Sequence, residues 1–237
     1  RLTIMLLAPF IACFILPESN LIYFDQFELV KYVGIIGTLL LTTTLINGIN
    51  FIDGQNGLAA STSIVILSGL AFIAYFINDT ELFFISLTAV AATLGFLIFN
   101  FPKAKIFLGD GGAYFLGFII AIMSIYLTQK HHLQVSVWSI VALCIMPLSE
   151  VTFSVIRKLC FDKISPLQSD KYHIHQLIFR NLGMRNQALP TLIILPFVIG
   201  NTVFVTYYYN QPMYLLLSIV VYILFYTLGY TRSEEHT

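Results

Sequence analysis

Charged residues are scarce in this chain of 237 residues: they make up 10% of it, whereas a soluble domain averages about a quarter. With so few charges, the chain could not cover a surface that faces water. Hydrophobic residues make up 58%, and the mean hydropathy is +0.85. This composition excludes an ordinary soluble domain and predicts a polytopic membrane protein.

The chain also lacks an excess of either charge, since twelve Lys and Arg oppose twelve Asp and Glu. Without a basic surface, nucleic acid is not an expected partner. The three cysteines, Cys13, Cys144 and Cys160, are too few and too scattered for a disulfide framework. We expect the first two to act as small buried hydrophobes. The start has no charged region followed by a cleavage site, so no signal peptide is expected.

Long apolar runs, in contrast, are abundant. A membrane-spanning helix needs about 20 apolar residues, and the runs predict eight spans: 2–17, 29–48, 57–77, 82–99, 112–128, 135–156, 189–208 and 213–230. The runs are long and do not alternate with a period of two, which favours helices over a barrel. The predicted fold is therefore an all-α, polytopic membrane helix bundle. It forms a single domain over 1–230, and the polar tail 231–237 has no assigned role.

The connections between spans fall into two classes by charge. One class, 18–28, 78–81, 129–134 and 209–212, has Lys130 and, just inside the next span, Lys31 as its basic residues. The other class, 49–56, 100–111 and 157–187, carries Lys103, Lys105, Arg157, Lys158, Lys163, Lys171, Arg180 and Arg185. An excess of Lys and Arg marks the cytoplasmic side. We therefore expect the second class to be cytoplasmic and the first external, with a short helix around 173–181.

The first polar loop interrupts two apolar runs with Asn47, Asn50, Asp53 and Asn56 among several glycines. Polar groups at a membrane boundary are candidates for a functional site, although Asp-Gly and Asn-Gly pairs are also ordinary turns. If the preceding helix continues, Asn47, Asn50 and Asp53 lie near one face. Amides can donate to phosphate or sugar oxygens, and a carboxylate can ligate a hard cation.

The second loop ends in Gly109 and Asp110, where the next span begins. A helix start offers free N–H groups and the positive end of the helix dipole, which suit an anion. A carboxylate beside it could hold Mg²⁺ against that anion. A plain glycine turn is the alternative.

The third loop contains His173 and His175, preceded by Asp170 and Lys171. Two histidines among basic residues are typical of a phosphate-binding rim. A zinc site is the competing interpretation, but a third nitrogen or sulfur ligand is missing nearby.

Glu150 lies inside the sixth predicted span, and a buried carboxylate needs a partner. Ser154 or Arg157, one and two helical turns later, could pair with it, which favours a structural role. His131 and His132 fall in an external connection and are given no specific role.

Together the three loops resemble the motifs of the polyprenyl-phosphate N-acetylhexosamine-1-phosphate transferases, which are related to phospho-N-acetylmuramoyl-pentapeptide transferase. The first motif is matched by Asn47, Asn50, Asp53, Gly54, Gly57, Leu58 and Ala59. The second is matched by Phe107, Gly109, Asp110 and Gly112, and the third by Ser165, Pro166, Asp170, Lys171, His173 and His175. The motifs occur in family order, and the resemblance extends to about residue 230.

The resemblance implies transfer of a sugar-1-phosphate from a UDP-N-acetylhexosamine, such as UDP-N-acetylglucosamine, to polyprenyl phosphate, with release of UMP. It implies that Asp53, Asp110 and His173 are catalytic and that Asp110 and Asp53 hold Mg²⁺, with Mn²⁺ as an alternative. Substrate would be bound by Asn47, Asn50, Asn56, Gly109, Lys171 and His175. The expected setting is the bacterial plasma membrane, at the start of O-antigen, other lipopolysaccharide or teichoic acid synthesis, with a homodimer as a further expectation.

The chain also departs from the family pattern. Asn56 replaces an aspartate, Gln176 a histidine, Leu108 a methionine and Ala113 a serine. The family's Asp-Asp motif would precede the first span and is absent, and members have ten or eleven spans. These departures predict an N-terminally truncated enzyme that lacks part of its catalytic centre.

Two other functions remain open at this level. One is a non-catalytic relative of the family, which the replacements at Asn56 and Gln176 would favour. The other is a transporter that uses intramembrane carboxylates at Asp53 and Glu150, for which carboxylates in the middle of spans would be diagnostic.

Overall fold

The computed structural model describes residues 7–12, 23–25, 27–28, 31–165, 172–183 and 186–234, and most of them are helical. Its helices are α2 (Lys31–Ile52), α3 (Leu58–Phe76), α4 (Thr80–Asn100), α5 (Gly109–Lys130), α6 (Val137–Leu143), α7 (Ile145–Ile156), the π-helical turns η2 (Arg157–Asp162), α8 (Ile174–Asn181), α9 (Leu189–Tyr207) and α10 (Pro212–Glu234). The strands β1 (Tyr23–Phe24) and β2 (Phe27–Glu28) form a small antiparallel hairpin. The predicted all-α bundle is confirmed.

Six helices in the described part of the chain are long and apolar enough to cross a membrane: α2, α3, α4, α5, α9 and α10. The pair formed by α6 and α7 with η2 makes a seventh span if it is counted as one. Of the predicted span 2–17, only 7–12 is described, and it is helical. The chain is thus a multi-pass membrane protein, and the first of its eight predicted spans lies mostly outside the described residues.

The predicted span 135–156 is not one continuous helix, which corrects the sequence prediction. It breaks at Cys144, and the two halves are bent by 76°. The sequence contains a physical reason for the break: Pro147 has no N–H to donate to the carbonyl of Leu143, four residues earlier. A prediction from hydropathy alone does not detect this break in the helix.

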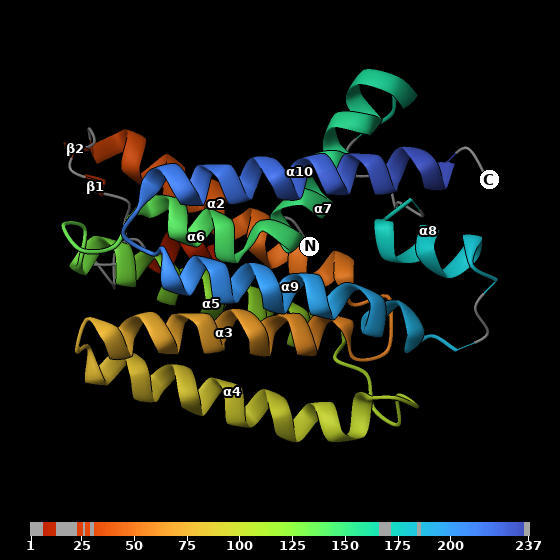
Figure 1. The fold of residues 1–237 in the computed structure, drawn as a ribbon, viewed down its shortest axis with the longest axis horizontal. Coiled ribbons are helices and arrows are strands. Elements are labelled where there is room, and N and C mark those ends of the chain that lie inside the picture. Colours follow the sequence, from red (N-terminus) through yellow and green to blue (C-terminus); the bar gives the residue numbers. More distant parts are fainter. Residues whose placement is uncertain are drawn as a thin grey trace.

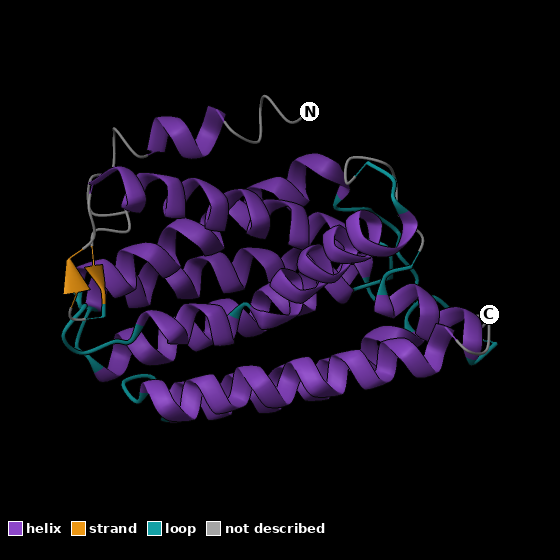
Figure 2. Ribbon diagram, turned by 90° about the horizontal axis from the view of Figure 1, so that it is seen from above, coloured by secondary structure: helices purple, strands orange, loops and turns teal. Residues whose placement is uncertain are grey.

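The helices lie roughly side by side along the long axis of the molecule (Figures 1 and 2). Helix α2 packs against α5 and α7, while α3 packs against α4 and α9. Glycines permit the closest approaches: a Cβ added to Gly117 of α5 would lie 2.6 Å from the Cα of Ile46, and one added to Gly48 would meet the carbonyl of Pro147. Small residues let helix backbones approach closely in membranes.

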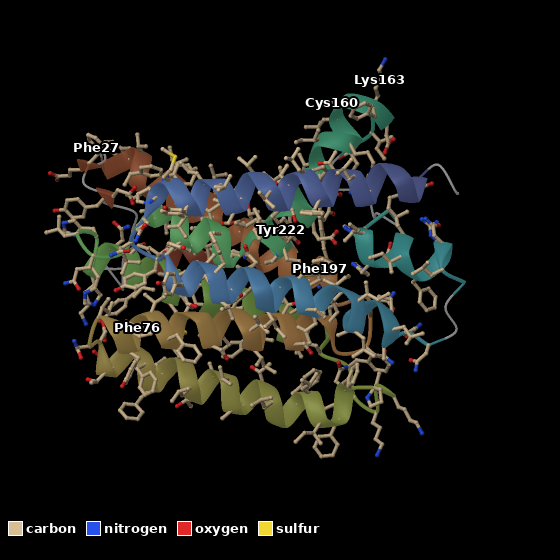
Figure 3. All side chains as sticks on the ribbon, viewed as in Figure 1. Phe27, Phe76, Cys160, Lys163, Phe197 and Tyr222 are labelled. Carbon is tan, nitrogen blue, oxygen red and sulfur yellow. The ribbon has the colours of Figure 1, made fainter. Side chains whose placement is uncertain are left out.

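Large apolar side chains are exposed on the outside of the bundle, as lipid contact requires. Among them are Phe84 and Ile98 on α4, Phe197 and Val203 on α9, and Leu217 and Phe225 on α10. Figure 3 shows such side chains pointing away from the helices along the length of the bundle.

The connections predicted to be external gather at one end of the bundle, here called the hairpin end. The Asp25 carboxylate accepts hydrogen bonds from the Ser136 hydroxyl (2.9 Å) and the Val137 N–H (2.7 Å). The Asp79 carboxylate lies 2.8 Å from Nε2 of His131. His131, which has no role in the sequence-based prediction, therefore joins two connections.

The connections rich in Lys and Arg gather at the opposite end, here called the basic end, together with η2 and α8 (Figure 1). The N–H of Asn56 donates to the Gln187 carbonyl (3.2 Å), and its side chain donates to the Pro102 carbonyl (2.9 Å). The predicted division into two ends is confirmed, as is the short helix near 173–181. That the basic end faces the cytoplasm stays a prediction.

A cavity of about 600 Å³ lies between α9 and α10 and reaches α7 and α8. Figure 3 labels two of its lining residues, Phe197 on α9 and Tyr222 on α10. Ile174 and Ile178 of α8 line its part near the basic end.

Candidate active site

The last turns of α2 present the first motif. The helix runs to Ile52, beyond the predicted limit at residue 48, so Asn47 and Asn50 both lie on it. The Asn47 side chain donates to the Thr43 carbonyl of the same helix (2.8 Å). The Asn50 side chain instead donates to the Asp110 carboxylate (3.2 Å). The structure therefore brings Asn50, but not Asn47, into contact with the second motif.

The start of α5 presents that second motif. Gly109 has φ +65, a left-handed conformation that favours glycine. This turn begins the helix and sets Asp110 in its first turn, as the sequence predicts. The Gly109 N–H and the charge of Asp110 both act on the Asp53 carboxylate. Two carboxylates and an amide from two motifs thus share one region.

The environment of Asp53 changes its acidity. Burial raises the pKa of the Asp53 carboxyl, the Gly109 N–H lowers it, and the negative charge of Asp110 raises it again, to about 6. Asp53 is therefore mostly ionised at neutral pH, where it repels Asp110. A bound cation would relieve that repulsion.

The donor set suits Mg²⁺ better than zinc. Mg²⁺ prefers oxygen ligands and is usually held by one or two carboxylates plus substrate phosphates and water. Asp53 and Asp110 supply such oxygens, and the first turn of α5 supplies N–H groups for a phosphate. No group of three or more His, Cys, Asp or Glu side chains that could cage a metal occurs among the described residues.

The two histidines of the third motif are buried against Glu150. His173 is 5% exposed and His175 is fully buried. Nδ1 of His173 lies 2.9 Å from Oε2 of Glu150, and Nδ1 of His175 lies 3.6 Å from Oε1. The partners of Glu150 are therefore these histidines, which corrects the pairing with Ser154 or Arg157. The sequence-based prediction considered only residues that follow Glu150 on the same helix. His173, which lies 23 residues later in the chain, comes close to it only in the folded structure.

The histidines also meet the end of α2. A Cβ added to Gly54 would lie 2.8 Å from Nε2 of His175, so this imidazole rests directly on the first motif. The ring of Phe51 lies 4.8 Å from that of His173. The C-terminal end of α2 thus contacts both other motifs, and the three loops converge at the basic end.

The remaining predicted residues have different surroundings. Asn56 forms hydrogen bonds to the carbonyls of Pro102 and Gln187. Its own carbonyl accepts a hydrogen bond from the Thr191 hydroxyl (2.8 Å). These contacts give Asn56 a role in holding the loops together. Lys171 lies outside the described residues. Nearby, the guanidinium groups of Arg157 and Arg180 both lie over the Tyr172 ring, at 4.9 and 5.3 Å.

Comparison with known proteins identifies relatives over much of the chain. Probable undecaprenyl-phosphate N-acetylglucosaminyl 1-phosphate transferase of Bacillus subtilis is 40% identical over 141 residues, 58% of this chain and 38% of the relative. Decaprenyl-phosphate N-acetylglucosaminephosphotransferase of Mycobacterium leprae is 28% identical over 68% of this chain and 45% of its own. Phospho-N-acetylmuramoyl-pentapeptide-transferase of Staphylococcus saprophyticus is 38% identical over 51% of this chain and 38% of its own.

The chain therefore spans less than half the length of these curated relatives. The model of glycosyl transferase family 4 matches residues 1–128, which is more than half of the chain and contains the first two motifs. The convergence of those motifs in the fold agrees with this match, and the chain belongs to glycosyl transferase family 4.

Proposed function

We propose that this chain forms the membrane-embedded part of an enzyme that transfers N-acetylhexosamine-1-phosphate from a UDP-sugar to polyprenyl phosphate and releases UMP. Family membership supports a transferase, and the names of the relatives point to a prenyl phosphate acceptor. Two of these names specify N-acetylglucosamine, so we take UDP-N-acetylglucosamine as the donor. The product would start a lipid-linked polysaccharide of the bacterial cell surface.

The observation that carries this proposal is the meeting of the three motifs at the end of α2. Asn50 donates a hydrogen bond to Asp110, the Asp53 carboxylate interacts with Gly109 and Asp110, and Gly54 packs against His175. Carboxylates, amides and imidazoles are the groups that hold a metal-bound diphosphate.

In this proposal Asp53 and Asp110 would hold Mg²⁺, which would supply positive charge to the phosphates of the donor. Asn50 orients the Asp110 carboxylate through its hydrogen bond. His173 and His175 would hold the diphosphate or the sugar nucleotide. The basic end faces the cytoplasm, where a soluble nucleotide sugar meets an acceptor phosphate at headgroup level.

A lipid acceptor also needs apolar surface for its tail. The cavity between α9 and α10 is lined mainly by apolar side chains and ends on α8, the helix that carries His175. We assign the prenyl tail to this cavity, with its phosphate toward the basic end.

The direct test uses protein expressed from its complete open reading frame, purified in detergent with undecaprenyl phosphate and Mg²⁺. We expect UMP release from UDP-N-acetylglucosamine, and a fall of at least about a hundredfold for His173→Ala, the range of acid–base and phosphate-binding groups. Gln176→Ala should have a mild effect.

Controls separate loss of function from loss of fold. Each variant should retain the wild-type thermal unfolding midpoint in detergent. Unchanged turnover in both His173→Ala and His175→Ala would remove the histidines from the site. Absence of UMP release from any UDP-N-acetylhexosamine by the wild-type protein would contradict the transferase proposal and favour a non-catalytic relative.

A further inference from the structure

Glu150 is a buried carboxylate to which the proposed reaction gives no direct task. It is 1% exposed and lies on α7, inside the bundle. A carboxylate in such a place is strongly destabilising unless other groups compensate its charge or bind its oxygens. Among the groups that face its two oxygens are the imidazoles of His173 and His175, both from the third motif. Tyr222 and Tyr226 of α10 lie near the same carboxylate.

The geometry of this cluster is specific. Nδ1 of His173 lies 2.9 Å from one carboxylate oxygen, and Nδ1 of His175 lies 3.6 Å from the other. The two rings are parallel within 4°, with their centroids 5.7 Å apart. Both imidazoles therefore turn the same nitrogen toward one carboxylate.

An ionised carboxylate only accepts hydrogen bonds. Facing it, Nδ1 of a neutral imidazole carries the hydrogen, and Nε2 on the opposite edge is then the acceptor. The hydrogen bond made by one ring nitrogen decides the state of the other. Glu150 can thus set the tautomer and the orientation of the His173 ring, while its charge faces His175 at 3.6 Å, beyond hydrogen-bond distance.

The other edge of His175 faces the first motif. Its Nε2 lies 2.8 Å from the position that a Cβ on Gly54 would occupy. This nitrogen is buried, and the described residues provide no hydrogen-bond partner for it. Both nitrogens of the His175 ring are therefore buried without a hydrogen-bond partner among the described residues, and the ring packs between Glu150 and Gly54.

We propose that Glu150 is the positioning residue for His173 and His175. It holds the His173 ring through Nδ1 and faces His175 at 3.6 Å. The Nε2 of His173 is then left as an acceptor for a hydroxyl or amide N–H group of the sugar nucleotide. This inference rests on the proposed function, and it adds a residue that none of the three motifs contains.

The kinetic test compares Glu150→Gln with wild type. Glutamine keeps the shape, but its amide can donate as well as accept, so it no longer imposes one tautomer. We expect kcat to fall about a hundredfold, while KM for the UDP-sugar changes less than about threefold. Glu150→Asp keeps the charge and should retain at least about ten times the kcat of Glu150→Gln. Glu81→Gln, on the exposed surface at the hairpin end, is the matched control and should match wild type.

Two kinetic outcomes would overturn the inference. One is a wild-type kcat in Glu150→Gln. The other is an equal loss of kcat and of thermal unfolding midpoint in Glu150→Gln and Glu150→Asp, because a purely structural carboxylate predicts no rescue by the shorter acid.

A second measurement uses the wild-type protein and does not depend on turnover. Nitrogen NMR of ¹⁵N-histidine-labelled protein distinguishes the two neutral tautomers, with signals assigned by their loss in His173→Gln and His175→Gln. We expect hydrogen on Nδ1 of His173. Hydrogen on Nε2 of neutral His173 would overturn the inference, even if the transferase proposal itself failed.

Discussion

Asn50 and Asp110 are 60 residues apart, and the side-chain amide of the first donates to the carboxylate of the second at 3.2 Å. This bond joins the end of α2 to the first turn of α5. An amide N–H orients the carboxylate without neutralising its charge, which suits a side chain that is to ligate a cation. Groups that orient a metal ligand typically change metal affinity or activity by about 10- to 100-fold when removed.

The charge of Asp110 is tested by Asp110→Asn. The amide oxygen of the new side chain can still accept from Asn50, so the loop should keep its shape while the charged oxygen is lost. We expect transferase activity to fall at least about a hundredfold, the scale of several kcal/mol that a metal ligand supports. A Mg²⁺ titration of UMP release measures it. Wild-type activity of Asp110→Asn at saturating Mg²⁺ would show that Asp110 has a structural role in the turn and does not bind the metal.

The contact between Gly54 and His175 is tested by Gly54→Ala. The added Cβ would lie 2.8 Å from Nε2 of His175, so the buried imidazole must move. A displacement of this kind at a reacting site is expected to lower kcat by about tenfold or more. Gly95→Ala is the control, since a Cβ there meets nothing within 4 Å. Equal activity of the two variants would show that the position of His175 is unimportant.

The cavity between α9 and α10 is tested by Gly200→Leu. Gly200 lines the cavity, and a Cβ there meets nothing within 4 Å, so the larger side chain can occupy space assigned to the prenyl tail. We expect KM for polyprenyl phosphate to rise about tenfold, or about 1.4 kcal/mol of binding, and KM for the UDP-sugar to stay unchanged. Gly95→Leu on α4, away from the cavity, should leave both constants unaltered. If the two variants bind the prenyl substrate equally well, its tail lies elsewhere.

Asp79 should make stability at the hairpin end depend on pH. Burial raises the pKa of this carboxyl, but hydrogen bonds from His131, the Leu82 N–H and Lys130 outweigh that effect and hold the pKa below its ordinary value of 3.8. Ionised Asp79 therefore stabilises the fold above about pH 4, and this contribution is lost as pH falls through its lowered pKa.

The variant Asp79→Asn keeps a side-chain oxygen that can cap α4 but removes the charge. We expect its free energy of unfolding at pH 7 to be lower than that of wild type by about 1–2 kcal/mol. The difference should shrink progressively as pH falls below about 4. Unfolding measured in detergent at several pH values checks this. A difference that persists unchanged at the lowest pH would assign the effect to packing.

The orientation of the bundle is tested by cysteine labelling in a cysteine-free background. Lys103 and Glu81 are exposed at opposite ends of the bundle. A membrane-impermeant maleimide added to intact cells should label Glu81→Cys and leave Lys103→Cys unlabelled until the cells are opened. Fast labelling of Lys103→Cys from outside would reverse the predicted topology. The physical basis is the accumulation of Lys and Arg on the cytoplasmic side.

Much of the architecture could be predicted because the relevant properties are local in sequence. Long apolar runs predict helices, since a backbone in lipid must satisfy its hydrogen bonds within one segment. The separation of basic from acidic connections predicts which loops share an end, and Asp79 and His131 at one end and Asn56 and Pro102 at the other confirm it. The short motifs were recognisable because their residue types and spacing lie within single loops.

What the sequence by itself determined, then, is the membrane class, the two ends and the candidate residues of each loop. Tertiary structure alone decided which of these residues meet: Asn50 with Asp110, and Glu150 with His173 rather than with its helical neighbours. Those pairs are set by helix packing and by the return of a loop 23 residues later. The spacing of residues in the sequence does not predict these contacts. A buried charge requires a partner that is close in space, and that partner can lie anywhere in the chain.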